Sequence, residues 1–454
     1  MLRHRRRPRT VFGRALIKAE LIAGTPRIRR IPFWSRDAID RLVDRRLRDT
    51  VQTACKHVPW YRDRVAEGAL NPDSIQSASD LEDWPTVGLH QLHHEPLSML
   101  SDQWKREECI EILSSGSSGH RKTIYLEPNA FLANALGQGR HTQIANNVVG
   151  HAPLKRRLTM APLVSNQQRL RLMYGDWLAL RPSRHSMIAR VNVFASFEEK
   201  LAEINRVKPD VIGGVTGVVS NFFMGVLDRG VECHRPRLLN VSVEGFTREH
   251  RERIEKELGI PALVAYASVE VPKLGFECEE RNGYHIHEDF CVVRIVDDDN
   301  HDLADGKTGR VIVTNLINRA TMLINYDQGD KGCITHEPCP CGRTFPRIFL
   351  SSTKETPLLE APNGRVVHHA DLLRPIVAAP EFVRLQVVVE SPDHWRLLIE
   401  SKDPEVSKAW IDTITDPLKE WTEGTVRLDV EFTRDFEMSP ISGKQSPVII
   451  REKQ

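Results

Sequence analysis

Long apolar runs are missing from this sequence. No stretch approaches the roughly 18 uninterrupted apolar residues that a membrane-spanning helix needs, and no apolar secretory segment follows the first residues. The 454 residues include only 8 Cys, too few for a disulfide-stabilised scaffold. Gly and Pro, 27 of each, are near average usage, which excludes collagen-like and low-complexity proteins. We therefore expect a cytoplasmic globular protein that is large enough for more than one domain.

Charge of one sign is concentrated only at the N-terminus. Residues 1–30 contain ten Lys or Arg and one Glu, a net charge of +9, so the rest carries −7 against a total of +2. A solvated terminal arm is the favoured interpretation of residues 1–30, and contact with an anionic membrane surface is the alternative. Elsewhere the chain lacks the basic, aromatic-interleaved surface of nucleic-acid-binding proteins, so we expect no nucleic-acid partner.

Hydrophobic periodicity predicts the main elements. Apolar residues recur at helical spacing from Asp37 to Val58, and Pro59 ends that helix. Short apolar runs on either side of a polar loop predict strands over residues 109–113 and 122–126. Further strands are expected at 211–215, 238–243 and 262–266, with a helix at 218–227 and an antiparallel hairpin formed by 290–296 and 310–314.

The pattern changes after Ser351. Strands are expected at 382–390, 395–400 and 426–432, with a helix over Val406–Ile414 that ends before Pro417. Alternating strands and helices are typical of layered α/β folds. The sequence therefore predicts an α/β protein, with a large multi-layer N-terminal α/β domain and a small α+β C-terminal domain.

A polar loop is the first candidate for chemistry. Residues 114–121 read SSGSSGHR and are followed by Lys122. Small residues let backbone amides and hydroxyls surround an anion, and the Lys could neutralise a phosphate. A plain surface loop is the simpler interpretation when the loop is considered alone.

Three further residues are candidates because of their positions. Glu270 follows the strand ending at Tyr266, where ligands gather in α/β folds, and its carboxylate could hold Mg²⁺. Asp330 follows a Gly turn and could accept two hydroxyl hydrogen bonds, as a ribose would offer. Lys444 lies on a small-residue loop near the C-terminus. Each is also compatible with an ordinary exposed side chain.

Cysteines and histidines suggest a metal site. Cys278 precedes His285 by seven residues, and Cys339 and Cys341 form a Cys-Pro-Cys turn further along. Three thiols and an imidazole match a closed, structural zinc site. The competing ligands are Cys333, His287 and His336.

In this order, the motifs resemble the adenylate-forming superfamily, specifically its phenylacetate–CoA ligase-like branch, which includes capsule-biosynthesis relatives. The resemblance covers most of the chain. It rests on SSGSSGHRK, YASVEV, GYHIHED, GRVIVTNL, INYDQGD, CPCGRTFPRI and MSPISGKQSPVII. It implies a basic arm at 1–30, a large domain at 31–350, a hinge at 351–360 and a lid domain at 361–454.

The resemblance also implies an activity. ATP and a carboxylic acid, aromatic by analogy, would give an acyl-adenylate, and coenzyme A would then take the acyl group. Glu270 would sit at Mg²⁺, Asp330 at the ribose, Tyr266 near the adenine or acyl group, and Lys444 between carboxylate and α-phosphate. Zinc would be structural. The other ATP- or AMP-binding residues would be Ser115, Gly116, Ser117, Ser118, Gly119, Lys122 and Ser268.

Some positions depart from the family pattern. The hinge usually reads Gly-Arg-x-Asp-Asp, and Ser352 to Thr356 stand there instead. Ala267 replaces a usual Gly, and Asp327 replaces a usual Arg. The altered hinge leaves alternatives open: transfer to an amine, hydroxyl or carrier thiol, a nucleotidyl transferase, or a non-catalytic relative that binds nucleotide.

Overall fold

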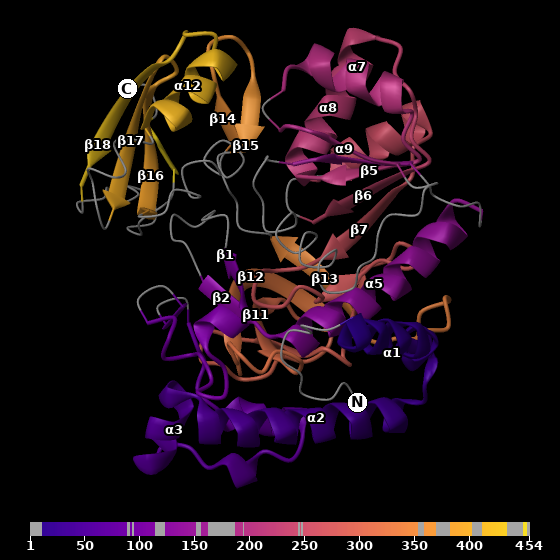
Figure 1. Ribbon diagram of the computed structural model, residues 1–454, viewed down its shortest axis with the longest axis vertical. Coiled ribbons are helices and arrows are strands. Elements are labelled where there is room, and N and C mark those ends of the chain that lie inside the picture. Colours follow the sequence, from indigo (N-terminus) through magenta and orange to yellow (C-terminus); the bar gives the residue numbers. More distant parts are fainter. Residues whose placement is uncertain are drawn as a thin grey trace.

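A computed structural model gives the fold (Figure 1). It describes residues 11–88, 91–92, 95–113, 123–150, 156–161, 187–193, 195–243, 246, 248–352, 358–368, 382–401, 411–433 and 448–451. None of the helices in these ranges is long and apolar enough to span a bilayer.

Eleven of the described strands form one sheet, in the order β10-β11-β12-β13-β9-β8-β7-β6-β5-β3-β4. Strands β3 to β7 pair in parallel, and the other pairs are antiparallel. The parallel strands are β3 (Arg156–Met160), β4 (Met187–Val191), β5 (Val211–Gly214), β6 (Leu238–Ser242) and β7 (Ala262–Tyr266). The antiparallel strands are β8 (Gly275–Phe276), β9 (Tyr284–Ile286), β10 (Cys291–Val296), β11 (Gly309–Asn315), β12 (Tyr326–Thr335) and β13 (Arg347–Ser352). The predicted α/β class and the β10–β11 hairpin are confirmed.

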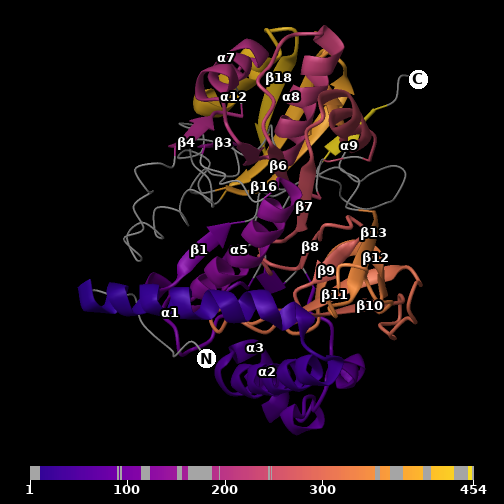
Figure 2. The ribbon, with the colours of Figure 1, turned by 90° about the vertical axis from the view of Figure 1, so that its right-hand side faces the viewer.

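Helices cover both faces of the parallel part because its strands are apolar on both sides. Ile212, Leu239 and Val241 belong to one buried cluster. This cluster also includes residues of α7 (Phe197–Val207), of α8 (Thr216–Arg229) and of η5 (Ile254–Leu258), which directly follows α9 (Arg248–Arg253). Their alternate neighbours Val211 and Leu238 belong to another, which includes α5 (Pro128–Val148). Figure 2 shows α5 running from the lower part of the molecule towards this sheet.

The N-terminal helices lie below α5, with α1 against it and α2 and α3 lowest in the molecule (Figures 1 and 2). They are α1 (Val11–Arg30), η1 (Ile31–Phe33), α2 (Arg36–His57) and α3 (Pro59–Ala66), followed by the short turns η2 (Pro72–Ser74), η3 (Ala78–Asp83) and η4 (Arg106–Glu108). The predicted 37–58 helix is confirmed as α2, which buries its apolar stripe. The end of α1 packs on α5, where the Arg29 guanidinium donates to the Gly139 carbonyl at 3.1 Å. A Cβ on Gly24 would meet Leu136 Cδ2 at 3.1 Å, so a small residue allows this approach.

Strands β1 (Ile110–Leu113) and β2 (Thr123–Leu126) pair as an antiparallel hairpin that leads into α5. Glu127 caps α5, accepting from the Asn129 and Ala130 amides at 2.5 and 2.9 Å. Burial raises the pKa of Glu127 from 4.5 to about 7.

The raised pKa of Glu127 predicts a pH dependence of stability. Between about pH 4.5 and 7 the unfolded chain has lost this proton while the folded chain keeps it, so the free energy of unfolding falls as pH rises. In the wild-type protein this effect should lower the free energy of unfolding by about 3 kcal/mol, and Glu127→Gln should abolish that decrease. Urea unfolding at several pH values from 5 to 8 measures it. Exposed Glu67→Gln is the control. An unchanged slope in the Glu127 variant would refute this explanation.

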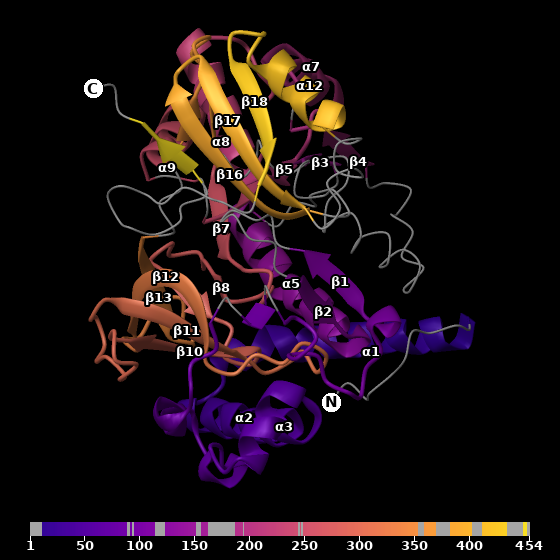
Figure 3. The ribbon, with the colours of Figure 1, turned by 90° about the vertical axis from the view of Figure 1, so that its left-hand side faces the viewer.

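The C-terminal part has its own core. Its sheet has the order β18-β17-β16-β19, with a separate β14–β15 pair. The elements are β14 (Leu358–Glu360), β15 (Val366–His368), β16 (Phe382–Ser391), β17 (His394–Ser401), α12 (Ile411–Trp421), β18 (Arg427–Phe432) and β19 (Val448–Ile450). Trp395, Leu397 and Leu418 are buried together in a cluster confined to this part. Figure 3 shows this sheet above the antiparallel strands of the large sheet.

The prediction that the C-terminal helix ends before Pro417 is wrong. Helix α12 runs through Pro417 to Trp421. Proline costs a helix one amide donor and a local clash, and here the residues after it offset that cost by packing. Leu418 is 2 % exposed and Trp421 packs against the same core.

Candidate active site and a cysteine–histidine cluster

Three side-chain pairs join the end of β7 and the segment that follows it to β12. The Tyr266 hydroxyl donates to Asp330 Oδ2 at 2.7 Å, the Gln328 amide donates to Ser268 Oγ at 3.2 Å, and the Tyr326 hydroxyl donates to Glu270 Oε1 at 3.0 Å. Along these three pairs the residue number rises by two in the first segment and falls by two in β12. The two segments therefore lie antiparallel and connect through side chains, although β7 and β12 are not neighbours in the sheet.

Glu270 is held from two sides. Its carbonyl accepts from Asn315 Nδ2 at 2.9 Å, and its carboxylate accepts from buried Tyr326. Only 3 % of Glu270 is exposed. Because buried acids are costly without donors or cations, a fixed carboxylate here suits a divalent cation such as Mg²⁺, which prefers oxygen ligands.

Asp330 is fixed by a tyrosine. Burial, and then the negative charge of Asp330, raise the pKa of Tyr266 well above its usual value. The hydroxyl therefore stays protonated and remains a donor to Asp330. A carboxylate oriented in this way can accept hydrogen bonds from vicinal hydroxyls.

The structure brings together four sequence candidates: Tyr266, Ser268, Glu270 and Asp330. The other ATP-site candidates lie outside the described residues; they are Ser115, Gly116, Ser117, Ser118, Gly119, Lys122 and Lys444. Residues 353–357 of the predicted hinge also lie outside the described residues. Leu113 and Thr123, the described residues that flank the 114–122 segment, are paired in the β1–β2 hairpin.

Sequence reasoning did not assign roles to Tyr326, Gln328 or Asn315. Tyr326, Gln328 and Asp330 are alternate residues of one segment. Because alternate residues of a strand face the same side, this spacing could have indicated that Tyr326 and Gln328 lie on the same side as Asp330. Asp327, which departs from the family pattern, points the other way and pairs with Arg310 of β11 at 2.8 Å. The acidic residue at 327 therefore has a local partner.

A second group of functional side chains comprises Cys278, His285, Cys339 and Cys341. One ligand atom from each lies within 4.8 Å of all the others. Cys278 Sγ is 3.8 Å from Cys339 Sγ, and Cys341 Sγ is 3.3 Å from His285 Nε2. The other His285 nitrogen, Nδ1, lies 2.7 Å from the Phe345 carbonyl, which orients the ring. Hydrogen bonds from Cys278 and His285 lower the pKa of Cys341.

This donor set fits a tetrahedral structural zinc ion, which takes thiolate sulfur and imidazole nitrogen. The competing ligands are occupied or lie outside the cluster. His287 Nδ1 contacts Arg140, His336 Nδ1 pairs with Asp305 at 2.8 Å, and Cys333 is not a member.

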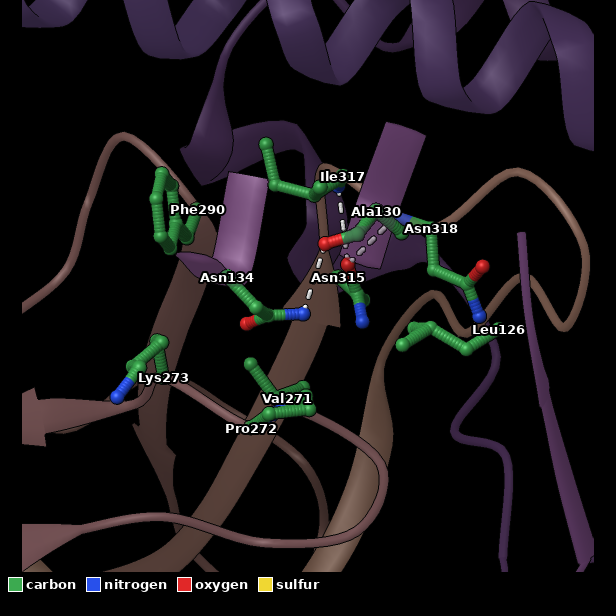
Figure 4. A pocket seen from close by; sticks show the side chains of 10 residues that line it. All are labelled: Leu126, Ala130, Asn134, Val271, Pro272, Lys273, Phe290, Asn315, Ile317 and Asn318. Carbon is green, nitrogen blue, oxygen red and sulfur yellow. Dashed lines mark hydrogen bonds between the residues drawn. The ribbon is translucent and has the colours of Figure 1, made fainter. Parts of the chain in front are cut away.

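A small cavity of about 10 Å³ lies behind the Glu270 loop (Figure 4). Asn315, Lys273, Asn134 and Phe290 are among its lining residues. It has room for roughly one water molecule. Figure 4 shows the Lys273 ammonium directed away from Val271 and Pro272.

Comparisons with known proteins show relatives along most of the chain, although no family model matches it. The chain is 25% identical over 400 residues to the phenylacetate-coenzyme A ligase of Thermus thermophilus, covering 85% of this chain and 86% of that one. It is 26% identical over 303 residues to the Pseudomonas putida ligase of the same name, covering 65% of this chain and 66% of that one.

Solved structures share the fold. A 2-hydroxyisobutyryl-CoA ligase in complex with 2-HIB-AMP and CoA matches with a TM-score of 0.58 and 18% identity, covering 93% of this chain and 91% of that one. The same ligase in its postadenylation state, in complex with R3-HIB-AMP, matches with a TM-score of 0.57, 16% identity and the same coverage. By sequence and fold, the chain is similar to phenylacetate-coenzyme A ligases and shares the fold of solved adenylate-forming CoA ligases.

Proposed function

We propose that this chain is an AMP-forming acid–thiol ligase that activates a carboxylic acid with ATP and passes the acyl group to coenzyme A. The observation that carries the proposal is the joint anchoring of Glu270 and Asp330 at one place, by Tyr326 and Tyr266. A cation-binding carboxylate beside a hydroxyl-binding carboxylate is what a magnesium–nucleotide substrate requires.

The chemistry has two steps. A carboxylate oxygen of the acid attacks the α-phosphorus of ATP, and the α–β phosphoanhydride bond breaks to release pyrophosphate. The thiol sulfur of coenzyme A then attacks the acyl carbon, the bond to AMP breaks, and the thiol proton is released. Both reactants of the first step are anionic, so catalysis needs preorganised donors and cations.

Residue roles follow from this chemistry. Glu270 would hold Mg²⁺, which neutralises phosphate charge when bound, and Asp330 would accept the ribose hydroxyls. Tyr266 and Ser268 would line the nucleotide. The 115–119 segment and Lys122 would bind the phosphates, and Lys444 would bridge the carboxylate and α-phosphate.

We also propose a structural zinc ion at the Cys278 cluster, a large domain at 31–350, a hinge at 351–360 and a lid at 361–454. The separate C-terminal core supports this division. A cytoplasmic location fits these substrates, and the basic 1–30 segment is the part that would contact a membrane surface.

The test is acid-dependent pyrophosphate release with Mg-ATP over aryl, fatty and amino acids, with and without coenzyme A. Release that accelerates with coenzyme A is expected. Release without acceleration would point to an amine, hydroxyl or carrier-thiol acceptor. AMP retained on the product would indicate a nucleotidyl transferase. Nucleotide binding without turnover would contradict the proposal.

Tyr266→Phe should raise the KM for ATP about five- to tenfold with little change in kcat, because Asp330 loses one neutral hydrogen-bond donor. Initial-rate kinetics at saturating acid measures both constants. Tyr284→Phe is the matched control, since Tyr284 lies close to Tyr266, with ring centroids 6.5 Å apart, but not against Asp330. Equal KM values for the Tyr266 variant and wild type would show that this hydroxyl does not orient the nucleotide site.

A further inference from the structure

A group of polar and basic side chains gathers beside α5, from the helix itself and from the loop after β7. Gln138 and His141 are one turn apart and lie on one side of the helix. The Lys273 ammonium donates to Gln138 Oε1 at 3.0 Å. His141 is 8 % exposed, and its Nε2 has no hydrogen-bond partner. Asn240, in the middle of β6, lies beside the His141 ring, so the group sits between α5 and the sheet.

The group has more positive than negative charge. Among the described residues, neither Lys273 nor Arg157 of β3 has an ion-pair partner. The nearby carboxylate of Asp289 is already used by Arg140, at 3.0 Å. Burial and the charges of Lys273 and Arg157 lower the pKa of His141 to about 3, and burial and Arg140 lower that of Lys273 to about 8. Lys273 is thus still largely protonated at pH 7.

Buried charges are ordinarily paired, because desolvation is expensive. A half-buried ammonium with an amide oxygen as its hydrogen-bond partner, next to a buried imidazole nitrogen without a hydrogen bond, is a place where an anion would be stabilised. Burial also strengthens such an interaction relative to one in water.

The group is close to the candidate active site along the chain. Lys273 is three residues after Glu270 in the same loop, and Asn315 both binds the Glu270 carbonyl and lines the same small cavity as Lys273 (Figure 4). A molecule whose carboxylate reacts near Glu270 could therefore extend its far end towards α5.

We propose, on the basis of the proposed function, that the acid substrate carries a second anionic group, which Lys273 binds with support from Gln138 and His141. The substrate class is then a dicarboxylic acid or another acid with a distal negative charge. Lys273 acts as a specificity residue and takes no part in bond making.

The experiment compares paired acids with the wild-type protein: phenylacetate with 4-carboxyphenylacetate, benzoate with terephthalate, and hexanoate with adipate. Acid-dependent ATP–pyrophosphate exchange gives kcat/KM for each. We expect at least one dianionic acid to exceed its partner by about tenfold or more. Lys273→Met should lower kcat/KM for that acid about 10- to 100-fold, and should change kcat/KM for the matching monoacid less than about threefold. Lys273→Arg should retain part of the preference for the dianionic acid. Exposed Lys256→Met should change neither.

A monoacid that equals or exceeds its dianionic partner in every pair would overturn the inference, and this comparison needs no variant to fold. An unchanged preference in a folded Lys273→Met protein would also overturn it. Failure of the proposed function is distinct, because then no acid of either kind supports exchange.

Discussion

Glu270→Gln is expected to lower acid-dependent pyrophosphate release about 100- to 1000-fold. The substitution keeps the shape of the side chain and the hydrogen bond from Tyr326, and it removes the charge that would hold a divalent cation at the phosphates. The carboxylate lies in a site with 3 % exposure, so water cannot easily replace its effect. Initial rates at saturating Mg-ATP measure the change.

Tyr326→Phe is the matched control. It removes the hydroxyl donor to Glu270 but leaves the negative charge, so a loss below about tenfold is expected. If Glu270→Gln retained activity within about threefold of wild type, with an unchanged melting temperature, Glu270 would not be the cation-binding carboxylate.

Cys341→Ser should remove the bound zinc and lower the melting temperature by roughly 10 °C. The four ligands connect β9 and the segment just after β8 to the 339–341 turn. The Thr344 amide, just after this turn, donates to the Pro32 carbonyl in the N-terminal helical segment at 2.7 Å. Arg343 pairs at 2.7 Å with Glu279, the residue after the ligand Cys278. Loosening the turn therefore weakens contacts across a large part of the core.

Elemental analysis and thermal unfolding measure the two effects, with about one zinc per chain expected in the wild-type protein. Cys333→Ser is the control, because this thiol lies on β12 outside the four-ligand group. Freshly purified wild-type protein without zinc, or equal stability of the two variants, would contradict the zinc assignment.

Local patterns predicted the elements whose stabilising contacts are near in sequence. The α2 stripe is one example, and β7 was predicted with its bounds, Ala262 to Tyr266. The continuous sheet was not predicted, because β9 pairs with β13 some sixty residues away and no local periodicity encodes that choice. The predicted end of the C-terminal helix before Pro417 was wrong for the same reason, because the packing of Leu418 in the core outweighs the local effect of the proline.

The candidate site shows the same division. Glu270 and Asp330 were proposed from the sequence because each follows a recognisable strand or turn, and the family resemblance implies a role for both. The side chains that hold them, Tyr326 and Asn315, depend on the antiparallel approach of two segments that are not sheet neighbours. The basic group at Lys273 was also missed, since its members come from α5, β3 and a loop.

The fate of the carboxylate oxygens tests adenylation most directly. An acid labelled with ¹⁸O in its carboxyl group would be converted with ATP and coenzyme A, and the phosphate-containing products would be examined by mass spectrometry. If a carboxylate oxygen attacks the α-phosphorus and the acyl carbon–oxygen bond then breaks, AMP must carry one ¹⁸O atom. Unlabelled AMP, or label in orthophosphate released together with ADP, would contradict activation through an acyl-adenylate.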